Sequence, residues 1–150
     1  ADLAFHTRIF VVIAGAYPLG LAMVKSGTSS LLASGLEQLI GGWHPGWALA
    51  LLFLTAALIT QLMSDAGTTA LIGPVAISLA QIMDQPPEPF IVTVAMAAVA
   101  SFLTPIGHHG NLLIYGAADY QFSDFLRVGL PLTLLVGVVT AVLVQVLWPV

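Results

Sequence analysis

The chain has 150 residues, of which 59% are hydrophobic and 7% are charged, and its mean hydropathy is +1.02. An ordinary soluble domain carries about 25% charged residues, so the composition excludes such a domain and indicates lipid as the solvent. The net charge of −4 with only three Lys and Arg residues excludes the basic cluster that nucleic-acid binding needs, and the absence of cysteine excludes disulfides and thiolate chemistry.

The first two predicted elements are a crossing helix and a helix that lies along the membrane surface. Residues 9–24 form an apolar run between Arg8 and Lys25, typical of a spanning helix that bends near Pro18. In 28–40 the leucines keep helical spacing while polar residues fall elsewhere, which predicts an interfacial helix. Because the chain lacks an initiator methionine and a signal-peptide pattern, we expect a piece of a longer protein.

Two apolar arms come next. They occupy 47–63 and 68–83, and the small or polar residues 64–67 join them. The second arm ends at the proline-rich acidic loop 84–89, which must face water. The arms are compatible with two tight spans or with one re-entrant hairpin.

An interrupted helix follows. The apolar run 90–103 is shorter than the roughly 20 residues that a crossing helix needs, and 112–115 is apolar again. We therefore predict one crossing helix that is broken at 104–111.

The end of the chain combines a polar segment with an apolar one. Residues 117–129 are polar with aromatic punctuation, which predicts an aqueous loop and a short interfacial helix capped by Ser123. Residues 131–148 are predicted to be the last crossing helix.

The two predicted breaks, at 64–69 and 104–111, are the places where chemistry is expected. Unwound backbone at membrane depth survives only inside protein or beside a water-filled cavity. The amino ends of the half-helices expose N–H groups that attract anions, and carbonyl groups at opposing ends suit Na⁺. The breaks thus indicate a transporter more than a structural subunit, which has no need of unwound backbone.

Three segments resemble the divalent anion/sodium symporter family, the citrate-transporter-like anion permeases. Residues 64–70 with Pro74 are similar to that family's hairpin tip, Ser-Asn-(Asn/Thr) followed by small residues, threonine and proline. Residues 104–116 and the stretch from Phe122 to Leu132 are similar to two further motifs. The resemblance covers nearly the whole chain.

This resemblance implies an all-α membrane protein with three crossing helices, one of them broken. It also implies a re-entrant helical hairpin at about 47–83, a broken helix at about 90–115 and an interfacial helix in one transmembrane unit, 1–150. That unit would be the C-terminal repeat half of an inverted-repeat transporter, which also needs the N-terminal half. The expected function is secondary transport of a small dianion, a dicarboxylate or sulfate. We expect the transporter to be a homodimer in the cell membrane, which in a bacterium is the inner membrane.

The expected coupling ion is Na⁺ or H⁺, with no other metal and no cofactor. The candidate substrate-binding residues are Ser64, Thr68, Thr69, His108, His109 and Asn111. The candidate cation-binding residues are Asp65, Gly107 and Asn111. No catalytic residue is predicted, because no nucleophile, base and orienting group occur together beyond the histidines and Asp65.

Each sharp interpretation has a simpler alternative. Asp65 stands where the family usually has asparagine, and an ionised carboxylate repels an anion and prefers a cation or a proton; alternatively it is a turn or helix-cap residue between two full spans. His108 and His109, which replace a threonine-proline-type tip, can donate to an anion or form a solvated bend. Asn111 can simply cap the following helix.

The alternative functions are an arsenite/proton antiporter of the wider superfamily, an intramembrane enzyme and a non-transporting structural subunit.

Overall fold

A computed structural model describes residues 2–40, 42, 44–117 and 120–148, without the side chains of 2–9, 12, 13 and 109. These residues form seven helices and no strand. The helices are α1 (Asp2–Lys25), α2 (Thr28–Ile40), α3 (Pro45–Ile59), α4 (Asp65–Ile82), α5 (Pro87–Ala98), α6 (His109–Ala117) and α7 (Phe122–Leu147). The predicted all-α fold class is confirmed.

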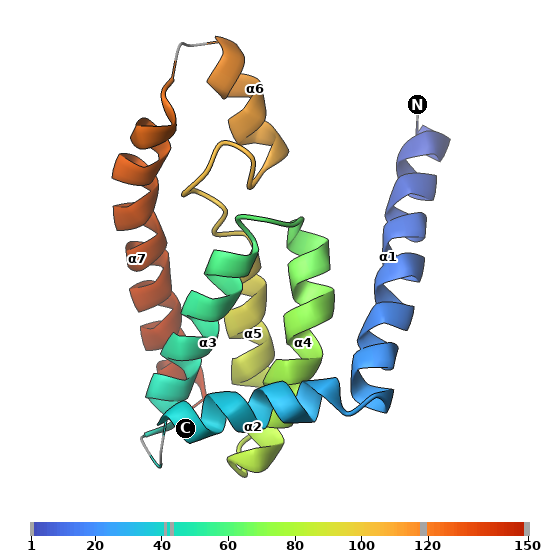
Figure 1. Cartoon of the computed structure of the whole chain (residues 1–150), viewed down its shortest axis with the longest axis vertical. Coiled ribbons are helices and arrows are strands. Elements are labelled where there is room, and N and C mark those ends of the chain that lie inside the picture. The colour runs from blue at the N-terminus through green and yellow to red at the C-terminus, as the bar shows by residue number, and fades with distance from the viewer. Residues whose placement is uncertain (1, 41, 43, 118–119, 149–150) are drawn as a thin grey trace.

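The helices α3, α4 and α5 stand side by side in the middle of the molecule (Figure 1). Helix α7 packs on α3 and α5, and α1 packs on α4 from the other side. Helix α2 has the predicted bounds and runs across the base of the upright helices, where Ser78 of α4 donates a 3.3 Å hydrogen bond to Ser29. An apolar helix crossing under a bundle in this way has the geometry that an interfacial helix requires.

Alanines line the contacts between the central helices. Ala48, Ala56, Ala76, Ala80 and Ala97 are all fully buried. Small side chains let helix backbones approach closely, which is how helices associate in lipid.

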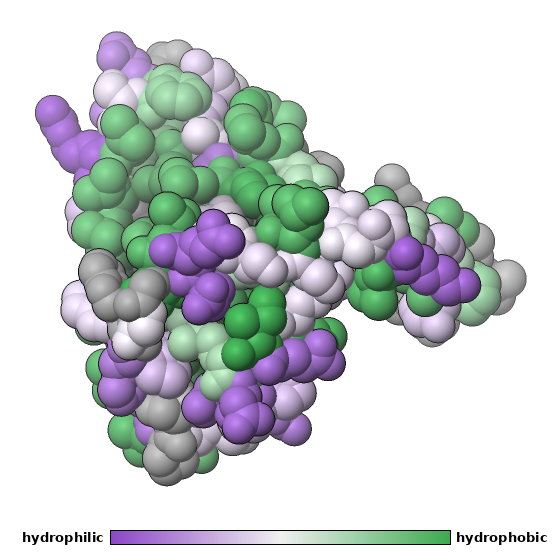
Figure 2. All heavy atoms as spheres, turned by 60° about the horizontal axis from the view of Figure 1, so that its bottom comes forward, coloured by the Kyte–Doolittle hydropathy of each residue, from purple (hydrophilic) through white to green (hydrophobic). Residues whose placement is uncertain are grey.

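Large apolar side chains cover much of the outer surface (Figure 2). On α7, Leu135, Val138 and Leu147 are each about 60% exposed. Among the described residues, α7 alone is long and apolar enough to cross a membrane by itself. Helices α3 and α5, with 15 and 12 residues, are shorter than the roughly 20 that a crossing needs.

Both breaks lie earlier in the chain than predicted. The first is at 60–64 and not 64–69, because the Ser64 hydroxyl accepts the Gly67 N–H at 3.2 Å and starts α4 at Asp65. The second is at 99–108 and not 104–111, because α5 ends at Ala98.

The predicted separation of a short helix from the last crossing helix is wrong. Residues 122–147 form one continuous helix through Pro131. Its cap is Gln121, which forms a capping box with Asp124, and not Ser123. In apolar helices a proline is tolerated where neighbouring groups satisfy the freed backbone.

Candidate functional site

The two breaks face each other across one cavity. The loop between α3 and α4 and the loop between α5 and α6 both lie between the upper and lower ends of α7 (Figure 1). The cavity between them has a volume of about 530 Å³. Its lining residues come from both loops: Leu62, Met63, Ser64, Asp65, Ala66, Ile106, Gly107, His108 and Leu112.

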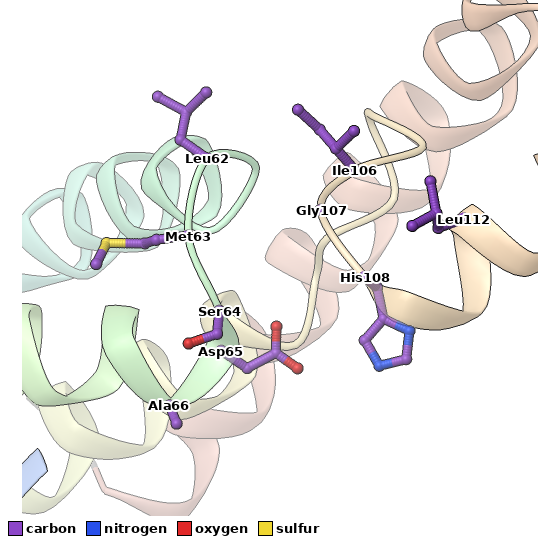
Figure 3. A pocket seen from close by; sticks show the side chains of 9 residues that line it. All are labelled: Leu62, Met63, Ser64, Asp65, Ala66, Ile106, Gly107, His108 and Leu112. Atoms are coloured by element: carbon purple, nitrogen blue, oxygen red, sulfur yellow. The ribbon is translucent and has the colours of Figure 1, made fainter. Parts of the chain in front are cut away.

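Asp65 is the acidic group of this cavity. Its carboxyl group points from the start of α4 toward the loop that carries His108 (Figure 3). The Thr60 hydroxyl lies 3.4 Å from Asp65 Oδ1 but donates a shorter bond, 2.6 Å, to the Ala98 carbonyl. A hydroxyl has one hydrogen to donate, and the shorter bond gives it to Ala98, so the carboxyl oxygens of Asp65 stay available to the cavity.

His108 forms the opposite wall and caps α6. Its Nδ1 accepts the Gly110 N–H at 3.0 Å. An accepting Nδ1 carries no proton, so in this arrangement the neutral ring has its hydrogen on Nε2. Next to it, the Gly107 N–H donates to the Thr104 hydroxyl at 3.0 Å, which holds the turn in place.

The amino ends of two helices thus reach the cavity. The start of α4 with its cap contributes residues 64–66 to the cavity wall, and α6 begins directly after His108. Helix amino ends carry partial positive charge and N–H groups without intrahelical partners. The cavity therefore combines features that bind an anion with one carboxylate that binds a cation or a proton.

Four predicted site residues lie in the cavity wall: Ser64, Asp65, Gly107 and His108. Thr68 is fully buried and its hydroxyl has no hydrogen-bond partner among the described residues, while Thr69 is exposed and donates to the Asp65 carbonyl at 2.8 Å. The structure does not bring these two threonines to the cavity surface. The side chain of His109 lies outside the described residues.

Asn111 does not line the cavity but holds the unwound segment behind it. Its Nδ2 donates to the Ser101 carbonyl at 2.8 Å and to the Thr104 carbonyl at 3.1 Å. The amide thus satisfies two carbonyls that no helix can satisfy.

Sequence reasoning missed Gln61, which is 5% exposed. Its Nε2 donates to the Ala57 carbonyl at 2.8 Å and to the Ala100 carbonyl at 3.1 Å, and its Oε1 accepts the Leu103 N–H at 3.1 Å. The available signal was the pair Thr60-Gln61 inside an otherwise apolar run, since a polar group buried at membrane depth must find a partner.

The backbone of α7 packs directly against the unwound segment at Gly129. A Cβ atom at this position would lie 2.2 Å from the carbonyl oxygen of Phe102. Only glycine permits this approach, so α7 and the second break are packed backbone against backbone.

In the part of the chain that the structure describes, no three histidine or carboxylate side chains lie close enough together to bind a transition metal. Asp65, hydroxyl groups and backbone carbonyls are instead the hard oxygen donors that suit Na⁺.

The sequence of the chain is similar to those of known transporters. The profile of the family described as the sodium:sulfate symporter transmembrane region matches residues 6–150. An uncharacterized transporter of Escherichia coli K12 is 36% identical over 146 residues, which cover 97% of this chain and 24% of that protein. An uncharacterized transporter of Synechocystis is 41% identical over 146 residues, with the same two shares.

More distant relatives have named substrates. Sodium/sulfate cotransporter 2 of Chlamydomonas reinhardtii is 24% identical over 132 residues, which cover 87% of this chain and 15% of that protein. The chain spans about a quarter of the length of the bacterial relatives.

Proposed function

Because the chain belongs to the sodium:sulfate symporter family, whose members are membrane transporters and not enzymes, we propose that it forms one repeat half of a secondary active transporter. The cargo is a small dianion, a dicarboxylate or sulfate, that moves with Na⁺ or H⁺. The observation that carries the proposal is the cavity where two helix amino ends and one carboxylate meet.

The anion binds to the hydrogen-bond donors of the cavity. The donors are the hydroxyl of Ser64, the ring N–H of His108 and those first N–H groups of α4 and α6 that Ser64 and His108 do not cap. Their partial positive charges stabilise an anion without a full counter-charge, which permits release. A volume of about 530 Å³ is within the range of small-molecule sites, and the names of the Chlamydomonas relatives support sulfate.

The coupling cation binds at Asp65, with backbone carbonyls near Gly107 as further ligands. The negative charge of a carboxylate can be neutralised either by a proton or by a neighbouring Na⁺. A proton and Na⁺ therefore compete for the same role. Asparagine, the family's usual residue here, cannot take up a proton in this way.

In this transporter the α3–α4 pair is a re-entrant hairpin, and α5 and α6 are the two halves of a broken crossing helix. The lengths of α3 and α5 support this, since neither reaches across a bilayer by itself. In inverted-repeat transporters the site lies near the bilayer midplane between the two repeats. A second repeat then supplies the other half of the site, and the assembly is a homodimer in the cell membrane.

Counterflow uptake by the full-length parent protein tests this function. Proteoliposomes receive labelled succinate or sulfate, with and without Na⁺, at two pH values. We expect saturable uptake of one dianion that depends on Na⁺ or on the pH gradient, and no uptake by the 150-residue chain alone. Chemical turnover of the solute, or uptake that ignores both ions, would contradict the proposal.

A further inference from the structure

Gln61 connects the two halves of the candidate site. It lies in the break 60–64, just after the end of α3, and three of its groups contact the unwound segment 99–108. Its Nε2 donates to the Ala100 carbonyl at 3.1 Å, its Oε1 accepts the Leu103 N–H at 3.1 Å, and its own carbonyl accepts the Thr104 hydroxyl at 3.4 Å. The Thr104 hydroxyl in turn accepts the N–H of Gly107 in the cavity wall.

The chemistry of these contacts requires an amide. One end of the Gln61 side chain donates two hydrogen bonds, to Ala57 and Ala100, and the other end accepts one from Leu103. A carboxylate of the same size has no hydrogen to donate, and leucine can neither donate nor accept. Since the side chain is 5% exposed, water does not replace a lost partner there.

We propose that Gln61 is a positioning residue for transport, which sets the distance between the hairpin tip with Ser64 and Asp65 and the unwound segment with Gly107 and His108. Gln61 itself stays outside the cavity wall and acts through the backbone that it holds. The proposal rests on the proposed function, because the distance matters only if one solute contacts both tips. Groups that share a ligand must keep their geometry to within a fraction of an ångström to bind it well.

A distance measurement tests the connection without reference to transport. Ala66 and Ile106 are exposed and lie on the two tips. Spin labels on cysteines at these positions, in a cysteine-free version of the parent protein, report the distance between the tips by pulsed electron resonance. We expect one narrow distribution for the parent and a broad one for Gln61→Leu. Gln81→Leu, which changes an exposed glutamine of α4, is the matched control and should keep the narrow distribution.

Uptake kinetics test the consequence for the site. For Gln61→Leu we expect the KM for the dianion to rise about 10- to 100-fold per folded transporter, with a smaller change in the maximal rate, because a misplacement of about 1 Å at a binding site has effects of that order. A loss of stability alone would lower the amount of folded protein and leave the KM of the remainder unchanged.

Gln61→Glu provides a pH-dependent rescue, measured as the KM of the folded transporter, which a loss of stability alone leaves unchanged. The ionised side chain cannot donate to Ala100, whereas the protonated carboxyl group regains one donor. The ratio of the variant KM to the parent KM should therefore fall as the pH is lowered. Asp65 and His108 line the cavity in both proteins, so the parent profile is the reference for the variant. If Gln61→Leu does not fold, this variant carries the whole test.

Each arm has an outcome that overturns the idea. Unchanged distance distributions in the Gln61 variants would overturn the connection between the tips. Broadened distances with an unchanged KM would overturn the positioning role. If the parent takes up neither succinate nor sulfate, the proposed function fails, and the positioning role for transport fails with it, while the distances still decide whether Gln61 joins the tips.

Discussion

Replacing Gly129 by alanine should separate α7 from the unwound segment behind the cavity. The added Cβ would lie 2.2 Å from the carbonyl oxygen of Phe102, 2.6 Å from its carbonyl carbon and 3.0 Å from the nitrogen of Leu103. A carbon atom packs at about 3.3 Å or more from a carbonyl oxygen, so one backbone must retreat by about 1 Å. Both neighbours are backbone and cannot rotate away. We expect a loss of about 2–3 kcal/mol in the free energy of unfolding, the upper part of the range for overpacking.

The same displacement should reach transport, because the segment that moves carries the cavity wall. A shift of about 1 Å corresponds to a loss on the order of 10²-fold in uptake per folded transporter. The assay combines denaturant unfolding of the purified parent protein with initial rates of uptake. Gly35→Ala in α2 is the matched control, since its Cβ meets nothing within 4 Å and alanine favours the helix by about 1 kcal/mol. Equal stability and uptake for the two variants would refute the backbone-to-backbone packing.

Three further predictions concern the cavity and its supports. Asp65→Asn should flatten the dependence of uptake on pH and sharpen any dependence on Na⁺, while Asp65→Ala should abolish both. If Asp65→Asn is fully active and its pH profile superimposes on that of the parent protein, Asp65 only starts the helix. Asn111→Leu removes two hydrogen bonds from the unwound segment and should lower stability by about 1–3 kcal/mol for each carbonyl left buried without a partner. Denaturant unfolding measures this loss, and a variant as stable as the wild type would contradict it. A cysteine at Ala66 should react slowly with a membrane-impermeant reagent and be protected by substrate; fast reaction from the side opposite Asp84 without protection would exclude a re-entrant hairpin.

Several helices could be predicted because their causes are local. The bounds of α2 at Thr28–Ile40 follow from the helical spacing of its leucines. The start of α4 was predicted at residue 68, three residues late, because the capping role of Ser64 was not recognised. The interruptions were visible as polar residues between apolar runs.

The positions of the breaks could not be read from the pattern. Residues 99–103 are mostly apolar, and only the partners that they find off the helix, the Gln61 and Asn111 amides, let their backbone stay unwound. Conversely, 122–131 looks like a separate element because it is polar and holds a proline, yet it continues straight into the apolar half of α7. A helix ends where its backbone groups find better partners, and those partners lie far away in the chain.

By itself, the sequence determined the solvent, the helical class, the interruption of two neighbouring elements and the resemblance to an anion symporter, because composition, spacing and short motifs are local properties. The tertiary structure alone decided which polar residues face the cavity and which support it from behind. It placed Ser64, Asp65, Gly107 and His108 around one cavity. It also placed the Gln61 side chain where it forms hydrogen bonds with the backbone of the second break. The physical reason is that a buried polar side chain acts on whatever packing brings within 3 Å or so of it, and packing between distant segments leaves no mark in the local pattern.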